Sequence, residues 1–464
     1  MMGNVMGNDT ADATIVLDIG KTNVKLTLLD AGGATLAEQR MPNAVVNDGP
    51  YPHHDTERIW DWMLTTFHAF ARVAKVGAIV PVTHGATAAL VDEYGLVLPV
   101  LDYESALPQK MNALYALERP PFAQTFSPAL PAGLNLGRQL VWLANVFPAE
   151  FAQADHILTY PQYWAWRLCG VAASEATSLG CHTDLWQPVT QEYSSLAARM
   201  GWSAMFPPIQ PAWAPLGPLR LALASLTGLP ADCQVLCGIH DSNASLLRYL
   251  GDASGSDTGT VLSSGTWLIA ASFGTDLAQL DESADMLANT NALGQPVACM
   301  RFMGGREFGA LAGPVPAVCQ LADIARLVAR GTFALPCFAE SGGPFSGRTG
   351  SIHGPAPHSG EERYALATLY CVLMTDYCLD ALAATGPVTV EGSFTGNPHF
   401  AALLSALRPG ELISQSDDAS GTTCGGWLLH RWGQTRVSSG AAVAPADIPG
   451  LRDYRDRWLE LISQ

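Results

Sequence analysis

Two short segments of the chain place small polar residues between strand-like runs, a pattern that suits the binding of an anion. In residues 14–30, Val, Ile, Leu and Thr dominate both runs. The turn between them consists of Gly20, Lys21, Thr22 and Asn23. Because glycine tolerates a positive φ or the close approach of a ligand, backbone amides of this first polar turn can converge on a phosphate group. Asp18 ends the first run, where its carboxylate can hold Mg²⁺ directly or through water.

The first polar turn is not a Walker A loop. Gly20-Lys21-Thr22 is superficially similar, but that loop needs a glycine five residues earlier, and position 15 is Ile15. A strand, turn and strand also form an ordinary hairpin without any bound anion. The order and spacing of several such segments therefore indicate more than the first turn alone.

A second segment repeats the pattern far downstream. Residues 259–273 place a second polar turn, Ser263 to Thr266, between two strand-like runs. Two similar hairpins predict two similar lobes. Between them, Asp241 follows the apolar run 235–239 at the start of a predicted helix, and it is the best candidate for a general base. The structural alternative is an N-cap, because aspartate also accepts hydrogen bonds from the amides of a first helical turn.

Periodicity predicts the elements that must position these residues. A helix capped by Asp55 or Thr56 extends to about Val73. Apolar strands are predicted at 77–82, 88–91, 97–101 and 388–391, and helices at 138–146 and 361–385. Gly392 lies beyond the carboxyl end of the last strand, where ligands collect in open parallel sheets. Residues 421–427 open a last helix of the second lobe, and their small side chains suit nucleoside binding and close packing equally well.

Composition excludes several classes of function. The 464 residues, 48% hydrophobic and 14% charged, are ample for two sizeable lobes. The 42 acidic and 25 basic residues give a net charge of −17 without a basic block, which argues against nucleic acid and membrane partners. The ten cysteines contain no Cys-x-x-Cys pair and are expected to be reduced core residues. No signal sequence or membrane-spanning run is recognisable, so a cytoplasmic enzyme is expected.

Together these segments resemble the FGGY family of carbohydrate kinases, and the resemblance covers nearly the whole chain. Residues Asp18-Ile19-Gly20-Lys21-Thr22-Asn23 are similar to the family's first phosphate motif, and Ser264-Gly265-Thr266 to its second. Gly238-Ile239-His240-Asp241 resembles the Gly-Gly-His-Asp segment whose aspartate is the family's base. The resemblance implies an α/β fold with two actin-like (ribonuclease H-like) ATPase domains and an interdomain active-site cleft.

The resemblance also implies roles for individual residues. Asp241 is the expected catalytic base, and Asp18 is the expected ligand of Mg²⁺. The residues expected to bind ATP and its phosphates are Gly20, Lys21, Thr22, Asn23, Ser264, Gly265, Thr266, Gly392 and Asn397. The residues expected to bind the sugar are His84, Asp102, Tyr103 and His240. For the two histidines, an orienting role is favoured over proton transfer.

Two motifs favour a deoxyketose as the substrate. Thr83-His84-Gly85 is closer to the Thr-Trp-Gly of rhamnulose kinases than to the Gln-Met-His-Gly of xylulose-type and glycerol-type members, and Ser263 to Trp267 also matches the rhamnulose version. In the adenosine motif, residues 392–397 retain only the first glycine and the asparagine.

The resemblance therefore implies an ATP-dependent kinase of a ketose such as L-rhamnulose or L-fuculose. Residues 1–246 would form the sugar and first phosphate domain, and 247–464 the nucleotide domain.

Three alternatives stay open from the sequence. The first is a pentulose kinase of the xylulose or ribulose type. The second is a sugar sensor of the same fold without catalysis, although such a protein would be expected to lack Asp18 or Asp241, and both are present. The third is an ATPase that moves a protein partner, which would need a peptide domain or a polymer interface. The expected partners are a sugar and ATP, and a homodimer is left open.

Overall fold

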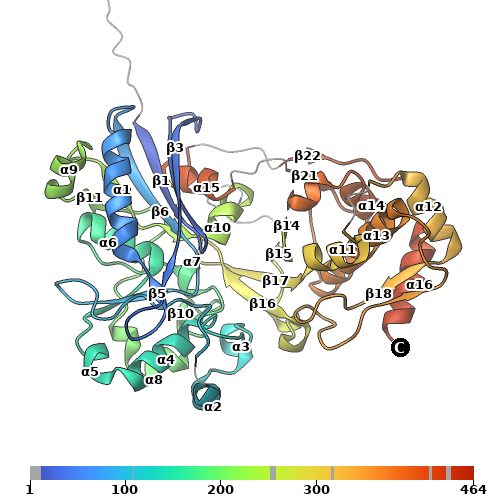
Figure 1. Ribbon diagram of the computed structural model, residues 1–464, viewed down its shortest axis with the longest axis horizontal. Helices are drawn as coiled ribbons and strands as arrows, with labels where there is room; N and C mark the ends of the chain where they lie inside the picture. The colour runs from blue at the N-terminus through green and yellow to red at the C-terminus, as the bar shows by residue number, and fades with distance from the viewer. Residues whose placement is uncertain (1–11, 108, 251–257, 315–317, 417–420, 435–439) are drawn as a thin grey trace, which may run out of the picture. The chain divides into compact units, whose positions relative to one another are not determined.

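The chain forms two compact units in a computed structural model that describes residues 12–107, 109–250, 258–314, 318–416, 421–434 and 440–464 (Figure 1). The first unit comprises Met1–Arg248, Thr290–Gln295 and Ser420–Arg436, and the second comprises Tyr249–Asn289, Pro296–Ala419 and Val437–Gln464. After residue 248 the chain therefore returns to the first unit twice.

A seven-stranded mixed sheet is the centre of the first unit. Its strands are β1 (Ala13–Ile19), β2 (Asn23–Leu29), β3 (Thr35–Pro42), β6 (Val76–Thr83), β11 (Pro215–Pro218), β12 (Gln234–Leu236) and β13 (Ile239–His240). Six follow the order β11-β12-β6-β1-β2-β3, and β13 also pairs with β6. β1 and β2 form the antiparallel hairpin predicted from the sequence, whereas β1, β12 and β13 all run parallel to β6.

The side chains of β1 are buried on both faces of the sheet, which explains its nearly continuous apolar sequence. Ile15, Leu17 and Ile19 belong to the same core cluster as the apolar side chains of α1 (Thr56–Phe70). On the opposite face, a Cβ atom added at Gly426 would lie 2.6 Å from Val16. Gly426 belongs to α15 (Gly421–His430), the red helix that lies beside the blue strands in Figure 1.

The remaining elements of the first unit are mostly short. The helices are α2 (Gln109–Glu118), α3 (Phe122–Thr125), α4 (Leu136–Val146), α5 (Pro148–Phe151), α6 (Tyr160–Cys169), α7 (Ala176–Leu179), α8 (Ser195–Arg199), α9 (Leu221–Thr227) and α10 (Asp241–Leu246). The paired strands outside the main sheet are β4 (Val45–Val46), β5 (His53–His54), β7 (Ala88–Val91), β8 (His156–Thr159), β9 (Trp186–Gln187) and β10 (Glu192–Tyr193).

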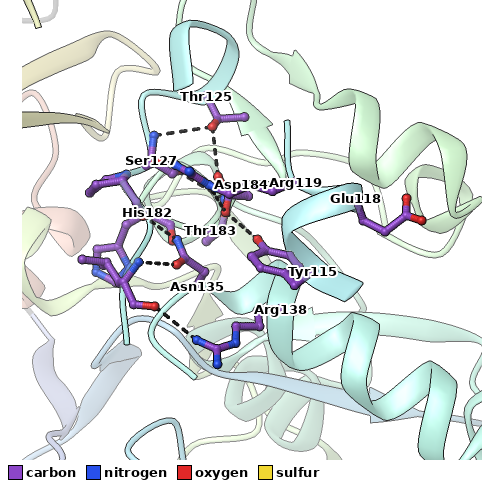
Figure 2. Close-up of polar contacts among 12 residues, drawn as sticks. Tyr115, Glu118, Arg119, Thr125, Ser127, Asn135, Arg138, His182, Thr183 and Asp184 are labelled. Atoms are coloured by element: carbon purple, nitrogen blue, oxygen red, sulfur yellow. Dashed lines mark hydrogen bonds and ion pairs between the residues drawn. The ribbon is translucent and has the colours of Figure 1, made fainter. Parts of the chain in front are cut away.

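A buried polar network joins several of these short elements around Asp184 (Figure 2). Its carboxylate accepts hydrogen bonds from the Tyr115 hydroxyl and, at 3.2 Å, from the Thr125 hydroxyl. The Arg119 guanidinium lies 3.4 Å away, and burial raises the pKa of Asp184 to about 6. The backbone amide of Asp184 also donates to the Ser127 hydroxyl at 3.2 Å. The network therefore fixes α2 and α3 to the segment that follows α7.

The second unit is built around another seven-stranded sheet, with the order β16-β17-β15-β14-β20-β21-β22. Its strands are β14 (Gly259–Ser264), β15 (Leu268–Phe273), β16 (Met286–Thr290), β17 (Pro296–Phe302), β20 (Val388–Gly392), β21 (Ile413–Gln415) and β22 (Ala441–Ala442). A separate pair consists of β18 (Phe333–Leu335) and β19 (Ser351–His353). The helices are α11 (Gly304–Ala312), α12 (Leu321–Arg330), α13 (Gly360–Ala381), α14 (Phe400–Leu407) and α16 (Leu451–Ile462).

Most of the predicted elements are confirmed, including both hairpins and the long helix α13. The prediction of a strand at 97–101 is wrong, because only isolated β-bridges at Leu96 and Leu101 occur there. The apolar side chains of that segment belong to a loop and pack into core clusters instead, among them Leu98 and Val100. The predicted helix at 421–427 exists as α15, but it packs within the first unit.

Candidate active site

Three parallel strands of the first unit end side by side, and a candidate site residue follows each of them. In the β1–β6 register Ile19 pairs with Thr83, and in the β6–β13 register Thr83 pairs with His240. The first polar turn, His84 and Asp241 therefore begin at the same edge of the sheet. The carboxyl ends of parallel strands are where α/β proteins bind ligands.

Two glycines permit this close arrangement. Gly238 has a φ of +85°, and a Cβ atom there would lie 2.4 Å from the carbonyl oxygen of Pro81. A Cβ atom at Gly85 would lie 2.7 Å from Nε2 of His240. A side chain at Gly238 would clash with the backbone of β6, and a side chain at Gly85 would displace the ring of His240.

Asp241 is the first residue of α10, and the N-cap is His240. One oxygen, Oδ1, accepts hydrogen bonds from the amide of Ser242 at 2.5 Å and its hydroxyl at 3.2 Å, and it lies 3.2 Å from Nε2 of His240. The Asp241 side chain keeps 30% of its surface exposed. Loss of water around the carboxylate raises its pKa, and the nearby His84 imidazole opposes this effect. This carboxylate can therefore accept a proton from a ligand.

His240 is held as a neutral imidazole. Burial lowers its pKa to about 4. Nδ1 lies 3.2 Å from the side-chain nitrogen Nδ2 of Asn243, and the backbone amide of His240 donates to the Thr177 hydroxyl at 3.2 Å. That hydroxyl in turn donates to the buried carboxylate of Glu175 at 2.5 Å. The chain of contacts fixes the backbone immediately before Asp241.

Asp18 lies near Asp241 within the first unit. The Asp18 carboxylate is 3.3 Å from the ammonium group of Lys25, and 15% of its side chain is exposed. Burial raises the pKa of Asp18, Lys25 lowers it, and the negative charge of Asp241 raises it further. A partly buried carboxylate beside a second carboxylate is a suitable ligand for a divalent cation, whose charge would offset both effects.

The ammonium group of Lys21 is engaged by acids from another loop. It forms an ion pair with Asp102 and lies 3.4 Å from Glu104. It also lies 5.0 Å from the centre of the Tyr103 ring. Because the strand predicted at 97–101 is absent, Asp102 follows only the isolated bridge at Leu101 and does not lie at a strand end. Lys21 therefore links the first polar turn to residues expected to bind the sugar.

The first polar turn is tight and closed by its own backbone. The amide of Gly20 donates to the carbonyl of Asn23 at 2.9 Å, and Asn43 donates from its side chain to the carbonyl of Gly20 at 2.8 Å. Gly20 does not have a positive φ, so close packing explains the glycine: an added Cβ atom would lie 3.2 Å from the Asn23 carbonyl oxygen. Thr22 and Asn23 are exposed at the tip.

A group of aromatic rings surrounds His84. Ring centres lie 5.3 Å away for Tyr103, 5.1 Å for Tyr160 and 5.1 Å for His54. Burial lowers the pKa of His84, and its Nδ1 lies 3.0 Å from the carbonyl oxygen of Gly85. Sequence reasoning missed His54. The available signal was the unusual pair His53-His54 directly before the N-cap Asp55 of α1.

Gln139 of α4 joins the loops that carry His84 and Tyr103. Its side-chain nitrogen donates to the carbonyl of Ala86 at 2.6 Å and to the carbonyl of Gly133 at 2.5 Å. Gly133 donates from its amide to the carbonyl of Tyr103 at 2.8 Å. The Asp184 network lies beneath α4, because Gly137 of this helix donates to the carbonyl of Thr183 at 2.8 Å. Gln139 and Gly133 thus position the rings of His84 and Tyr103 through the backbone of their loops.

In the second unit, the second polar turn lies next to the end of β20. Ser264 pairs with Gly392, and a Cβ atom at Gly392 would lie 2.0 Å from the carbonyl oxygen of Ser264. The Ser264 hydroxyl donates to the carbonyl of Glu391 at 2.5 Å and accepts from the amide of Phe394 at 3.0 Å. This hydroxyl therefore holds the loop after β20. Gly265 and Thr266 extend beyond it at the turn.

Asn397 is buried in the second unit. Its side-chain amide donates to the Thr368 hydroxyl at 2.9 Å, and its oxygen accepts from the amide of His399 at 3.1 Å. Because both ends of the side chain are used in this way, the structure gives Asn397 a role in shaping the loop around Gly392.

Within the described residues, no three acidic, histidine or cysteine side chains form a metal-binding cluster. A magnesium ion needs only one or two protein carboxylates when phosphate oxygens and water complete its shell, so a site of this kind does not require a larger cluster. The searched helices include none that is both long and apolar enough to cross a bilayer.

Family models match both domains of this chain. Two α/β domains of this type define the actin-like ATPase fold of sugar kinases. Residues 13–248 match the FGGY family of carbohydrate kinases, N-terminal domain, and residues 256–438 match the carbohydrate kinase FGGY, C-terminal domain. This chain belongs to the FGGY family of carbohydrate kinases.

Individual relatives agree with this assignment. L-fuculokinase of Salmonella typhi is 30% identical over 276 residues, and L-fuculokinase of Escherichia coli K12 is 26% identical over 278 residues. Each alignment covers 56% of this chain and 56% of the relative, so the chain matches little more than half the length of these proteins.

The solved structures match over almost the whole chain. A carbohydrate kinase from Novosphingobium aromaticivorans has a TM-score of 0.91 and 38% sequence identity, covering 97% of this chain and 98% of its own. A ligand-bound xylulose kinase from Lactobacillus acidophilus has a TM-score of 0.77 at 15% identity, covering 97% of both chains, and shares the fold alone.

Proposed function

We propose that this protein transfers the γ-phosphoryl group of ATP to a hydroxyl of a ketose. The observation that carries the proposal is the position of Asp241. This carboxylate lies at the meeting point of three parallel strands, beside the first polar turn and His84, with part of its surface exposed. A kinase acting on a sugar needs one carboxylate at such a point, because the attacking hydroxyl must lose its proton.

The residues around Asp241 suit a general base. The acceptor hydroxyl donates its hydrogen bond to the carboxylate and attacks the γ-phosphorus roughly in line, while the bond from this phosphorus to the β–γ bridging oxygen breaks and ADP leaves. The hydroxyl proton passes to Asp241. The raised pKa of Asp241 makes its carboxylate a better proton acceptor. The low pKa of His240 makes its imidazole a poorer one, so we assign the proton transfer to Asp241. Such a base typically contributes about 10²- to 10⁴-fold, so positioning supplies most of the acceleration.

Asp18 is the proposed ligand of Mg²⁺. When bound, the ion would neutralise charge on the phosphate oxygens during transfer. Asp18 fits this role because its partly exposed carboxylate lies near Asp241, and the raised pKa indicates a carboxylate that lacks stabilisation in the protein alone. Lys25, at 3.3 Å, holds the carboxylate in place.

The phosphates of ATP are proposed to contact the two polar turns. In the first unit, Gly20 to Asn23 form a tightly closed turn next to Asp18, with Thr22 and Asn23 exposed at its tip. In the second unit, Gly265 and Thr266 form a turn next to Gly392, with Thr266 exposed. The proposed sugar site lies in residues 1–246, and the proposed nucleotide site lies in residues 247–464.

The proposed substrates are L-fuculose and L-rhamnulose. Similarity to two L-fuculokinases and the Thr83-His84-Gly85 segment support this choice over a pentulose. His84, Asp102 and Tyr103 lie together in one unit, which supports their role in binding sugar hydroxyls. A ketose site with several polar groups would reject glycerol, since unpaired buried polar groups discriminate by about 10⁴-fold or more.

We also propose a cytoplasmic location. None of the ten cysteines, all within the described residues, forms a disulfide bond, and most are buried with raised thiol pKa values. Reduced, buried cysteines are typical of a reducing compartment.

The function is tested by measuring ATP consumption with a panel of acceptors. The panel contains L-fuculose, L-rhamnulose, L-ribulose, D-xylulose and glycerol, and kcat/KM is compared among them. A preference for either deoxyketose supports the proposal. Xylulose or ribulose as the best substrate would favour the pentulose alternative, and binding without turnover of any sugar would favour a sensor.

A further inference from the structure

We propose that His54 is a sugar-binding residue of this kinase and contacts a hydroxyl group of the acceptor through its ring nitrogens. The proposal rests on the proposed function, because it assigns a new residue to the same acceptor site. The structural basis is a cluster of unpartnered nitrogen atoms on two adjacent, buried histidines.

His54 is almost completely buried, with 2% of its surface exposed. Its ring centre lies 5.1 Å from that of His84 and 5.6 Å from that of Tyr160. Among the described residues, neither nitrogen of His54 has a hydrogen-bond partner, and Nε2 of His84 has none. The adjacent His54 and His84 rings therefore bring three unpartnered nitrogens into one cluster, and the ring centre of Tyr103 lies 5.3 Å from that of His84.

Such a cluster is unfavourable for the protein alone. Buried polar groups almost always have partners, because an unpaired donor or acceptor keeps the cost of leaving water. An apolar ring of similar size at position 54 would pack against Tyr160 without that cost. An imidazole at this position therefore points to a polar group from outside the chain.

The chemistry of the cluster fits a neutral hydroxyl compound. Burial lowers the pKa of His54, and the neighbouring His84 and Lys21 lower it further. A neutral imidazole offers one N–H donor and one acceptor, which matches a hydroxyl group that both donates and accepts. The charge of Lys21 is already paired with Asp102, so this lysine does not favour an acidic ligand.

His54 also lines a separate cavity of about 690 Å³. That cavity is lined by other residues of α1 and α6, such as Trp60 and Arg167, and also by His53. His84, Asp102 and Asp241 do not line it. The imidazole of His54 stacks on Tyr160 and lies tilted by 40° against His84, and because of this contact with His84 we assign its ring nitrogens to the acceptor site. His53 offers a matched control, since it lines the cavity and its Nδ1 lies 2.9 Å from the Tyr51 carbonyl oxygen.

The experiment compares His54→Phe, His54→Gln and His53→Phe with the wild-type protein. Thermal unfolding without ligand is measured first, and binding of L-fuculose and of L-rhamnulose is then measured by calorimetry without nucleotide. His54→Phe is expected to have an equal or higher Tm and at least 10-fold weaker binding of the preferred sugar. His54→Gln should recover part of the affinity, and His53→Phe should leave it unchanged.

Several outcomes would overturn the proposal. Unchanged sugar affinity in His54→Phe would mean that the sugar does not contact the ring nitrogens of His54 and that only water hydrogen-bonds to them. A lower Tm together with an equal loss of affinity in His53→Phe would indicate a structural role. Wild-type protein that binds a sugar without phosphorylating it would refute the proposed function yet leave the His54 comparison decisive. Absence of wild-type binding to both sugars would overturn the proposed role of His54 in a deoxyketose site, whereas the panel of acceptors tests the kinase function separately.

Discussion

Lys21, in the first polar turn, forms an ion pair with Asp102 in the loop that also carries Tyr103. Two parts of the site that the sequence separates by 81 residues are therefore coupled by one charge pair. The Asp102 side chain is 9% exposed, so loss of its partner would leave a nearly buried carboxylate without compensation.

Replacement of this lysine should affect both substrates. Lys21→Met is expected to raise the KM for the sugar and to lower kcat, because Asp102 loses its partner and the first polar turn loses its link to the sugar loop. Steady-state kinetics with each substrate varied in turn measures this. The double variant Lys21→Met/Asp102→Asn should recover stability, since it removes both charges. A single variant with wild-type kinetics and Tm would show that the pair has no functional role.

The assignment of Asp241 as the base predicts a specific kinetic loss. Asp241→Asn should lower kcat by about 10² or more and change sugar affinity little, because the amide keeps the shape but cannot take a proton. Asp92→Asn, at a surface turn, is the control and should retain full activity. Turnover close to normal in Asp241→Asn would exclude this residue from proton transfer.

Asp18 is predicted to be needed for the metal and not for folding. Asp18→Ala should abolish Mg²⁺-dependent turnover, since the carboxylate is the expected ligand of the ion. Circular dichroism should be unchanged, because the residue lies at a strand end. Lys25→Met, which removes only the partner of Asp18, should retain part of the activity. If Asp18→Ala unfolds instead, the carboxylate has a structural role.

The raised pKa of Glu175 predicts how the free energy of unfolding depends on pH. Burial raises its pKa to about 7 from the ordinary 4.5, so between these values the folded protein holds a proton that the unfolded chain has released. Stability therefore falls as the pH rises from about 5 to about 7, by up to roughly 3 kcal/mol from this group. Tm measured across this range should fall less steeply in Glu175→Gln. Parallel curves for the two proteins would contradict the raised pKa.

Local sequence pattern was sufficient for elements whose stability is local. Both hairpins and the helix capped by Asp55 could be predicted because alternation and capping are short-range signals. Residues 97–101 have an equally apolar pattern, but burial there comes from packing in a loop, which periodicity does not distinguish from a strand.

The site was only partly predictable, because its geometry depends on residues far apart in the chain. Asp241 and Asp18 could be chosen from their positions at predicted strand ends. The contact of His54 with His84, by contrast, depends on how a short strand packs against another loop. Likewise, nothing in the sequence near Lys21 indicates that Asp102 is its partner.

Because α15 packs within the first unit, this unit can complete its fold only after the ribosome has made α15. His430 of this helix contacts Thr14 of β1, and 416 residues separate them along the chain. At about 5 to 20 residues per second, a ribosome needs roughly 20 to 80 s to cover that distance. Throughout that interval, the apolar face around Val16 lacks its covering helix. We expect nascent chains stopped before residue 421 to bind chaperones and to be cleaved readily by proteases within the first unit.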